Sequence, residues 1–221
     1  MTEIAEHIKD FDNVELFNYL HETPGHYSDY SSLYIYLAKH PPMHDYYFEL
    51  FWKTRFWRTE PLTFLDLGPG VGYSLDVARE LGHKTYFVDR DIFISKYCEN
   101  KGHNLISMDY FELPLKDIGH FDYVLSRGSL NVDMMNETNF HIDLFLNWLV
   151  NLGKHIVVLP TWNKGPMIDG NDYTCVGQHL EDYLESKVHK AFMNFGFEQK
   201  SIEGVNDRLR FPITYEYFSI K

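Results

Sequence analysis

The stretch from Thr63 to Ser74, TFLDLGPGVGYS, restricts the possible folds of this chain more than any other. It begins with the apolar run of a buried strand, and the glycines that follow at alternate positions indicate a tight turn. Glycine has no Cβ, so the backbone of such a turn can approach a ligand closely. Residues 73–81 then have a helical pattern, and the free N–H groups at the start of a helix point back at the turn. The stretch therefore predicts a strand, a turn and a helix that together bind a nucleotide-like ligand.

The spacing of these glycines narrows the choice of ligand. Dinucleotide-binding turns have the pattern GxGxxG. Here Gly68, Gly70 and Gly72 form GxGxG, in which the third glycine comes one residue early, and Asp66 stands two residues before the first. This spacing disfavours NAD as the ligand.

Asp66 and these glycines resemble the first motif of the class I S-adenosylmethionine-dependent methyltransferases. Three later features follow in the order and spacing of that family. Asp89 ends the run TYFVD, where the family keeps the acid that holds the ribose hydroxyls. Asp109 in MDYF lies where the family keeps an acid near the adenine amino group, and residues 121–126, FDYVLS, resemble the fourth-strand motif. The resemblance covers residues 62–159 and implies that the cofactor is S-adenosylmethionine.

The resemblance also implies a set of cofactor-binding residues at the strand ends. They are Asp66, Gly68, Gly70, Gly72, Asp89, Asp109, Tyr110 and Ser126. A lone aspartate is more often a helix cap or a turn residue, but three at strand ends along one edge favour a ligand. Arg90 or Asp91 could replace Asp89 as the ribose contact if the second strand ends later than expected.

An alternation of strands and helices predicts an α/β fold of the doubly wound type. The expected strands are residues 63–67, 85–89, 104–108, 121–126, 155–159, 198–202 and 213–220, and the expected helices are residues 73–81, 92–101, 141–152 and 178–195. The last two strands have no helix between them and should pair antiparallel. The resemblance implies a seven-stranded sheet in the order 3-2-1-4-5-7-6 with the last strand antiparallel.

Residues 1–60 contain helix-length patches, one of them at residues 46–56. We interpret them as an N-terminal helical cap of the same domain, and residues 61–221 as the S-adenosylmethionine-binding methyltransferase domain. The tyrosine-rich segment 26–37 includes Tyr30. It resembles a segment that many of these methyltransferases place before the first strand, where a side chain reaches the methionine end of the cofactor. The alternative is that its tyrosines only cover the sheet.

Composition and charge disfavour several kinds of partner. The net charge is −12 at pH 7 and Lys and Arg form no cluster, so nucleic acid, whose binding depends on phosphate contacts, is an unlikely partner. The longest apolar region, residues 142–159, is interrupted by polar and charged side chains and predicts no membrane span. Two distant cysteines and a charged N-terminal stretch predict a cytoplasmic protein. No feature of the sequence indicates an oligomeric state.

Two segments that follow strands are expected to face the reacting methyl group, residues 127–133 and residues 161–177. Arg127, the first residue of RGSLNVD, could pair with a carboxylate or phosphate of the substrate. It could equally pair with Asp122 or Asp133 of the chain itself. Both interpretations stay open at this point.

Tyr30, Asn131 and Trp162 are further substrate candidates, although Trp162 could equally be a packing residue. The sequence SRGS after the fourth strand lacks the proline-rich tetrapeptide of enzymes that methylate exocyclic amines of bases, and it lacks the acidic pair of aminopropyltransferases. The loop that follows has a single acid, so no metal is expected.

Methyl transfer from a sulfonium is an in-line displacement that depends mainly on alignment, and no catalytic residue can be named from the sequence. We expect transfer to a small-molecule acceptor. The alternatives are a protein or nucleic-acid acceptor and a non-catalytic S-adenosylmethionine-binding protein.

Overall fold

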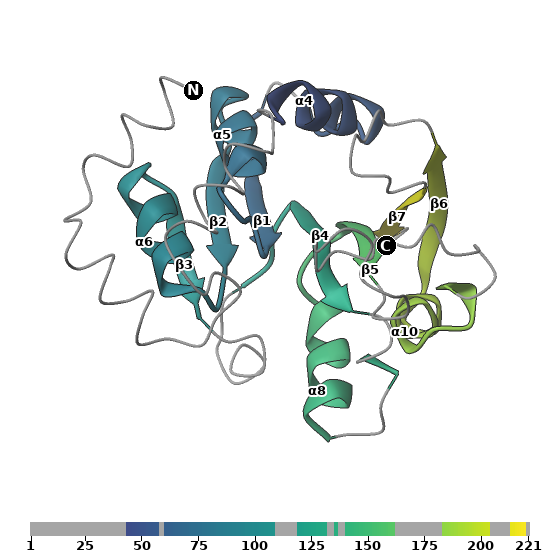
Figure 1. Cartoon of the computed structure of the whole chain (residues 1–221). Coiled ribbons are helices and arrows are strands. Elements are labelled where there is room, and N and C mark those ends of the chain that lie inside the picture. The colour runs from purple at the N-terminus through teal and green to yellow at the C-terminus, as the bar shows by residue number, and fades with distance from the viewer. Residues whose placement is uncertain are drawn as a thin grey trace, which may run out of the picture.

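The computed structural model describes residues 43–57, 60–108, 119–131, 135–136, 140–161, 183–203 and 213–219. Figure 1 shows their elements. In chain order these are α4 (His44–Lys53), β1 (Thr63–Leu67), α5 (Tyr73–Glu80), β2 (Lys84–Val88), α6 (Ile92–Asn100), β3 (Asn104–Ser107), β4 (Tyr123–Asn131), α8 (Phe140–Leu149), β5 (His155–Thr161), α10 (Lys187–Phe195), β6 (Phe197–Glu203) and β7 (Ile213–Ser219).

The strands form one seven-stranded sheet in the order β3-β2-β1-β4-β5-β7-β6. The first five are parallel, and β7 runs antiparallel to both of its neighbours. This confirms the predicted fold class. The chain moves outward from β1 to β3 and then returns to pair β4 with β1, so the connections on the two sides of β1 diverge. Ligands of open α/β sheets bind at the carboxyl ends of the strands beside such a switch point.

One face of the sheet is covered by α4, α5 and α6 (Figure 1). Aromatic rings join α4 to the central strands. The ring centroid of Phe51 on α4 lies 5.4 Å from that of Phe64 on β1 and 5.6 Å from that of Tyr123 on β4. All three side chains are fully buried, so α4 is held against the sheet beside the start of α5.

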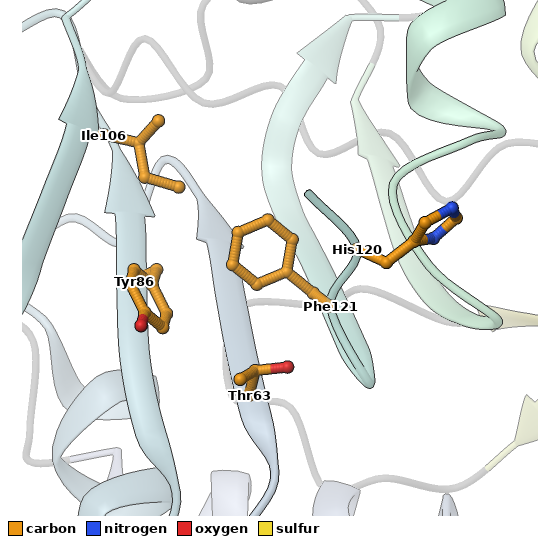
Figure 2. A pocket seen from close by; sticks show the side chains of 5 residues that line it. All are labelled: Thr63, Tyr86, Ile106, His120 and Phe121. Carbon is orange, nitrogen blue, oxygen red and sulfur yellow. The ribbon is translucent and has the colours of Figure 1, made fainter. Parts of the chain in front are cut away.

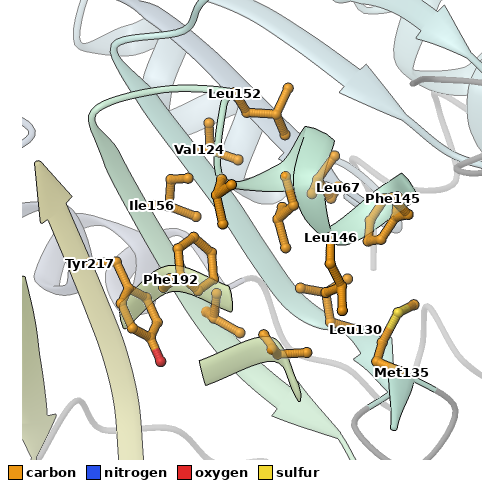
Figure 3. Packing of buried hydrophobic residues seen from close by; sticks show 14 of the residues in the cluster. Leu67, Val124, Leu130, Met135, Phe145, Leu146, Leu152, Ile156, Phe192 and Tyr217 are labelled. Carbon is orange, nitrogen blue, oxygen red and sulfur yellow. The ribbon is translucent and has the colours of Figure 1, made fainter. Parts of the chain in front are cut away.

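The opposite face is covered by α8 and α10, whose apolar side chains meet those of β4, β5 and β7 in Figure 3. The rings of Phe192 and Tyr217 stack with their centroids 4.1 Å apart. Among the described residues, no helix is long and apolar enough to cross a bilayer.

Two sequence-based expectations about this half are wrong. The strand predicted to end at Ser126 continues to Asn131, so the first five residues of the expected loop 127–133 are strand. Gly128 adopts a positive φ of 72° there, and the register with β5 shifts between Arg127 and Asn131. The polar sequence of a turn therefore forms an irregular strand that is supported by its neighbour.

The single helix predicted over residues 178–195 is also wrong in its described part. The chain leaves the helix at Glu185, and α10 begins after Ser186, whose side chain accepts the backbone N–H of His189 at 3.2 Å. Serine is favoured at this N-cap position because its oxygen satisfies a free N–H group. In α10, Phe192 is buried, whereas Phe195 is 49% exposed.

Candidate functional site

The turn after β1 has the backbone geometry that its glycines predict. Gly68, Gly70 and Gly72 have φ values of 86°, 55° and 81°, a region that residues with a side chain rarely adopt. The Gly68 N–H donates to the carbonyl oxygen of Val88 at 2.8 Å, which ties the turn to the end of β2. Gly72 is the N-cap of α5, so the turn leads directly into the start of that helix.

Asp66, the fourth residue of β1, is a buried acid whose hydrogen bonding is incomplete. It is 1% exposed. The hydroxyl of Ser74 on α5 donates to its Oδ2 atom, whereas Oδ1 is buried without a hydrogen-bond partner among the described residues. Burial raises the pKa of Asp66 to about 7, against the lowering effect of the Ser74 hydrogen bond. A buried acid with a strongly shifted pKa beside a glycine turn is typical of a functional site.

Asp89 follows β2 directly and lies against the same turn. Its carboxylate accepts the backbone N–H of Asp91 at 2.9 Å and that of Gly70. Burial raises the pKa of Asp89 to about 7, although both hydrogen bonds favour the charged form. The two alternatives are placed differently: Asp91 accepts the backbone N–H of Ile94 at 3.1 Å at the start of α6, and Arg90 is exposed. Asp89 is therefore the acid beside the glycine turn.

The end of β4 is fastened to the end of β1 by two serines. Ser126 is fully buried, and its hydroxyl lies 2.7 Å from that of Ser129. The Ser129 hydroxyl in turn donates to the carbonyl oxygen of Leu67. The Ser126 side chain thus supports the strand ends around the glycine turn.

Arg127 lies on the same face of the sheet as Asp66. Asp66 pairs with Leu125 across the two strands, and side chains two residues apart on a strand point to the same side. The guanidinium of Arg127 lies over the ring of Tyr46 on α4, 5.1 Å from its centroid, and its positive charge lowers the pKa of Asp66. Asp122, one suggested partner of Arg127, accepts the N–H and the hydroxyl of Thr63, each at 2.8 Å, near the start of β1.

Of the remaining predicted site residues, only Asn131 lies within the described part of the chain. Tyr30, Asp109, Tyr110 and Trp162 lie outside the described residues, as does Asp133, the other suggested partner of Arg127. Asn131 ends β4. The roles expected for these residues stay predictions.

Three neighbours of the site were missed by the sequence reasoning: Tyr46, Ser74 and Cys98. Ser74 is the second residue of α5, where the first helical turn faces the end of β1, so a hydroxyl at this position was a usable signal. Tyr46 contacts Arg127, and Cys98 contacts the turn. Both come from helices distant in sequence from these partners, so no local pattern indicates the contacts.

The described residues show no second site of comparable chemistry. No group of three or more His, Cys, Asp or Glu side chains within them could hold a metal ion. A shallow pocket of about 290 Å³, lined by Thr63, Tyr86, Ile106, His120 and Phe121, lies beside the first residue of β1, at the other end of the strand from the glycines. In Figure 2 the side chains of Tyr86 and Phe121 lie next to each other, with their rings edge to face, and His120 points away from them.

The site as described can receive a ligand that carries hydrogen-bond donors and a positive charge. Two carboxylates with pKa values near 7 lie beside the glycine turn. Carboxylates accept hydrogen bonds from hydroxyl and ammonium groups, and charge-assisted bonds of this kind are stronger than neutral ones.

Comparisons with known proteins agree with this chemistry. Residues 65–137 match the family model described as a methyltransferase domain. A search of curated protein sequences finds no match.

Several solved structures share the fold. Streptomyces venezuelae DesVI has a TM-score of 0.59 and 13% identity, with 86% of this chain and 98% of that chain covered. CalS10, an amino pentose methyltransferase from Micromonospora echinaspora solved with bound S-adenosylmethionine, has a TM-score of 0.56 and 17% identity, with 83% and 94% covered. Magnesium protoporphyrin IX methyltransferase from Synechocystis PCC 6803, solved with bound S-adenosylhomocysteine, has a TM-score of 0.54 and 13% identity, with 99% and 100% covered. The family match and the shared fold confirm the resemblance found in the sequence.

Proposed function

We propose that this chain is a class I S-adenosylmethionine-dependent methyltransferase that transfers a methyl group to a small-molecule acceptor by in-line displacement, a proposal supported by the match of residues 65–137 to a methyltransferase domain. The observation that carries the proposal is the pair of carboxylates beside the glycine turn, the buried Asp66 and the half-buried Asp89. Two similar structures support the acceptor class, since their names describe methyltransferases of an amino pentose and of magnesium protoporphyrin IX.

In the proposed complex each group of the cofactor has a matching group in the site. Asp89 accepts hydrogen bonds from the ribose hydroxyls, and the glycine turn leaves room for the methionine chain. The free oxygen of Asp66 accepts the methionine ammonium. Asp109 and Tyr110 would contact the adenine, and Ser126 would support the strand end beneath the cofactor.

The acceptor then occupies the space beyond the sulfonium, near the end of β4. Arg127 is the proposed anchor for an anionic group of the acceptor, and Tyr30, Asn131 and Trp162 are further candidates for its surroundings. Because the displacement depends on alignment behind the methyl carbon, these residues would contribute mainly by holding the acceptor in line.

Calorimetry tests the cofactor part of the proposal. S-adenosylmethionine and S-adenosylhomocysteine should bind and NAD should not. Asp89→Ala should weaken binding of S-adenosylhomocysteine about tenfold or more, because buried ribose hydroxyls lose a charged acceptor. Asp143→Ala, which removes an exposed carboxylate on α8, is the control and should leave the dissociation constant unchanged. An unchanged dissociation constant for Asp89→Ala would show that another residue contacts the ribose.

A turnover assay tests the acceptor part. The protein is incubated with S-adenosylmethionine and with separate pools of small metabolites, peptides and nucleic acids, and formation of S-adenosylhomocysteine is measured. Amino sugars and metalloporphyrins are the first compounds to include. Turnover with a peptide or nucleic-acid pool alone would overturn the small-molecule proposal, and cofactor binding without turnover in any pool would favour a non-catalytic binding protein.

We also propose that residues 1–60 cap the cofactor and line the acceptor pocket, with residues 61–221 forming the rest of the domain. The described part of this segment includes α4, whose Tyr46 ring supports Arg127 at the site. A variant that begins near His40 should fold, as judged by circular dichroism, but bind S-adenosylmethionine more weakly. Unchanged binding and turnover would show that the missing residues are no part of the site.

A further inference from the structure

Gly70, the middle glycine of the turn, is held from two sides. Its N–H donates to the carboxylate of Asp89 at the end of β2. Its carbonyl oxygen accepts a hydrogen bond from the thiol of Cys98 on α6, with the sulfur 3.6 Å from the oxygen. The peptide groups around Gly70 are thus fixed between a strand and a helix that lie apart in sequence.

The same sulfur fills the space beside Gly72. A Cβ atom placed on Gly72 would lie 3.1 Å from Cys98 Sγ and 3.7 Å from the nearest atom of Leu75. The distance to sulfur is shorter than an ordinary contact, so the turn already lies close against the thiol. Cys98 therefore meets the turn both as a hydrogen-bond donor and as a packing surface.

The surroundings of Cys98 suit a positioning role and no reactive one. The side chain is fully buried, and burial raises the pKa of its thiol far above the usual value, helped by the nearby charges of Asp89, Asp76 and Asp66. Reactive cysteines are thiolates in exposed, electropositive places. Cys98 keeps its proton and can donate it to Gly70.

We propose that Cys98 is a positioning residue of the cofactor site, which sets the place of the glycine turn through its contacts with Gly70 and Gly72. This inference rests on the proposed cofactor site. Through the position of the turn, α6 then influences the affinity for S-adenosylmethionine and S-adenosylhomocysteine without touching the ligand.

Calorimetry with S-adenosylhomocysteine tests the role, with thermal unfolding measured in parallel. Cys98→Ala should weaken binding about fivefold to tenfold, because a hydrogen bond that holds the turn is lost. Cys98→Ser keeps a donor on a shorter bond and should restore part of the affinity. The matched control is Ile94→Ala, which truncates a buried side chain one helical turn away on α6. It should lower the melting temperature more than Cys98→Ala but leave the dissociation constant within about twofold.

Equal dissociation constants for Cys98→Ala and the wild type would overturn the proposal. So would a pattern in which the affinity of all three variants merely follows their melting temperatures. Failure of the wild type to bind S-adenosylhomocysteine would instead refute the proposed cofactor site, so the two failures are distinguishable.

A double-mutant cycle with Gly72→Ala tests the contact itself. Gly72→Ala strains a positive φ and also crowds the Cys98 sulfur. The strain is the same in both backgrounds, but the crowding disappears with Cys98→Ala. Gly72→Ala should therefore cost less affinity and less thermal stability in the Cys98→Ala background than in the wild type. Additive effects would show that the sulfur does not position the turn.

Discussion

Two buried aspartates ten positions apart on the β1–α5 unit have opposite electrostatic surroundings. Asp66 at the end of β1 receives a hydrogen bond from Ser74 and has one oxygen without a partner among the described residues. Burial raises its pKa to about 7. Burial also acts to raise the pKa of Asp76 on α5, but a hydrogen bond from His103 and the charge of Lys101 outweigh it and hold that pKa below its usual value.

Both carboxylate oxygens of Asp76 have hydrogen-bond partners within the protein. Its Oδ1 atom lies 3.1 Å from His103 Nε2 and 3.3 Å from an Arg79 nitrogen, and Lys101 donates to Oδ2. The other ring nitrogen of His103 lies 2.8 Å from the Thr85 hydroxyl. Because burial lowers the pKa of His103, the neutral ring can donate to Asp76 and accept from Thr85. The network joins α5, β2 and the turn before β3.

This difference is the one expected between an acid that serves the fold and an acid that serves a ligand. Folding supplies every partner of Asp76, so its charge stabilises the native state. Among the described residues, Oδ1 of Asp66 has no hydrogen-bond partner, and a buried charge without full hydrogen bonding is costly until something binds it. A bound cofactor would supply hydrogen-bond partners to Asp66, as Lys101 and His103 supply them to Asp76.

The largest expected effect comes from breaking the complete network. Asp76→Ala leaves Lys101 and His103 without their common partner, and removing one member of a buried ion pair costs about 3 kcal/mol or more. Urea denaturation should show this loss, whereas the folded variant should bind S-adenosylhomocysteine with an unchanged dissociation constant. Asp143→Ala removes an exposed partner of Lys187 and should change the free energy of unfolding by less than about 0.5 kcal/mol. A selective loss of binding in Asp76→Ala would erase the contrast between the two acids.

Asp66→Asn should have the reverse effect on stability. The pKa of Asp66 is higher in the folded protein than in the unfolded chain, so the folded state loses stability as pH rises from about 4 to about 7. Asparagine cannot ionise, so the variant should be more stable than the wild type at pH 8, with the advantage shrinking towards pH 4. Its affinity for S-adenosylmethionine should fall about tenfold to a hundredfold, since the ammonium loses a charged acceptor. If Asp66→Asn were less stable than the wild type at pH 8 and bound S-adenosylmethionine equally tightly, Asp66 would not be the acceptor of the ammonium.

The sequence predicted best what depends on neighbouring residues. The strand before the glycines has the predicted bounds, Thr63–Leu67, because apolar run, glycines and helix start follow one another without a gap. The end of β4 was missed because SRGS is polar and contains Gly128, and only pairing with β5 makes it a strand. The break at Ser186 was missed because Leu184 and Val188 continue the apolar spacing across it. The contacts that distinguish Asp66 from Asp76 involve residues far apart in sequence, so no local pattern reveals them.

The pH dependence of cofactor binding tests the raised pKa values of the site in the wild-type protein. Hydroxyl and ammonium groups prefer ionised acceptors, and the pKa values of Asp66 and Asp89 are both raised to about 7. Affinity for S-adenosylmethionine should therefore rise about tenfold from pH 6 to pH 8, while the same ionisation lowers the stability of the free protein. Calorimetry in two buffers of different ionisation enthalpy should detect protons released on binding near pH 7. Affinity that is flat across this range would mean that neither carboxylate titrates in the site.

The smallest expected effect comes from Ser74, which donates a hydrogen bond to Asp66. The Ser74 hydrogen bond lowers the pKa of Asp66, so Ser74→Ala should move the midpoint of the binding profile to higher pH. At pH 7 the variant should bind about fivefold more weakly, in line with the loss of one hydrogen bond, and it should approach the wild type at pH 8.5. Ser95→Ala is the matched control, because that buried hydroxyl donates to the backbone oxygen of Asp89 at 3.1 Å and not to a carboxylate. A Ser74→Ala midpoint equal to that of the wild type and of Ser95→Ala would show that Ser74 does not tune Asp66. In that case the contrast between the two acids would rest on the partners of Asp76 alone.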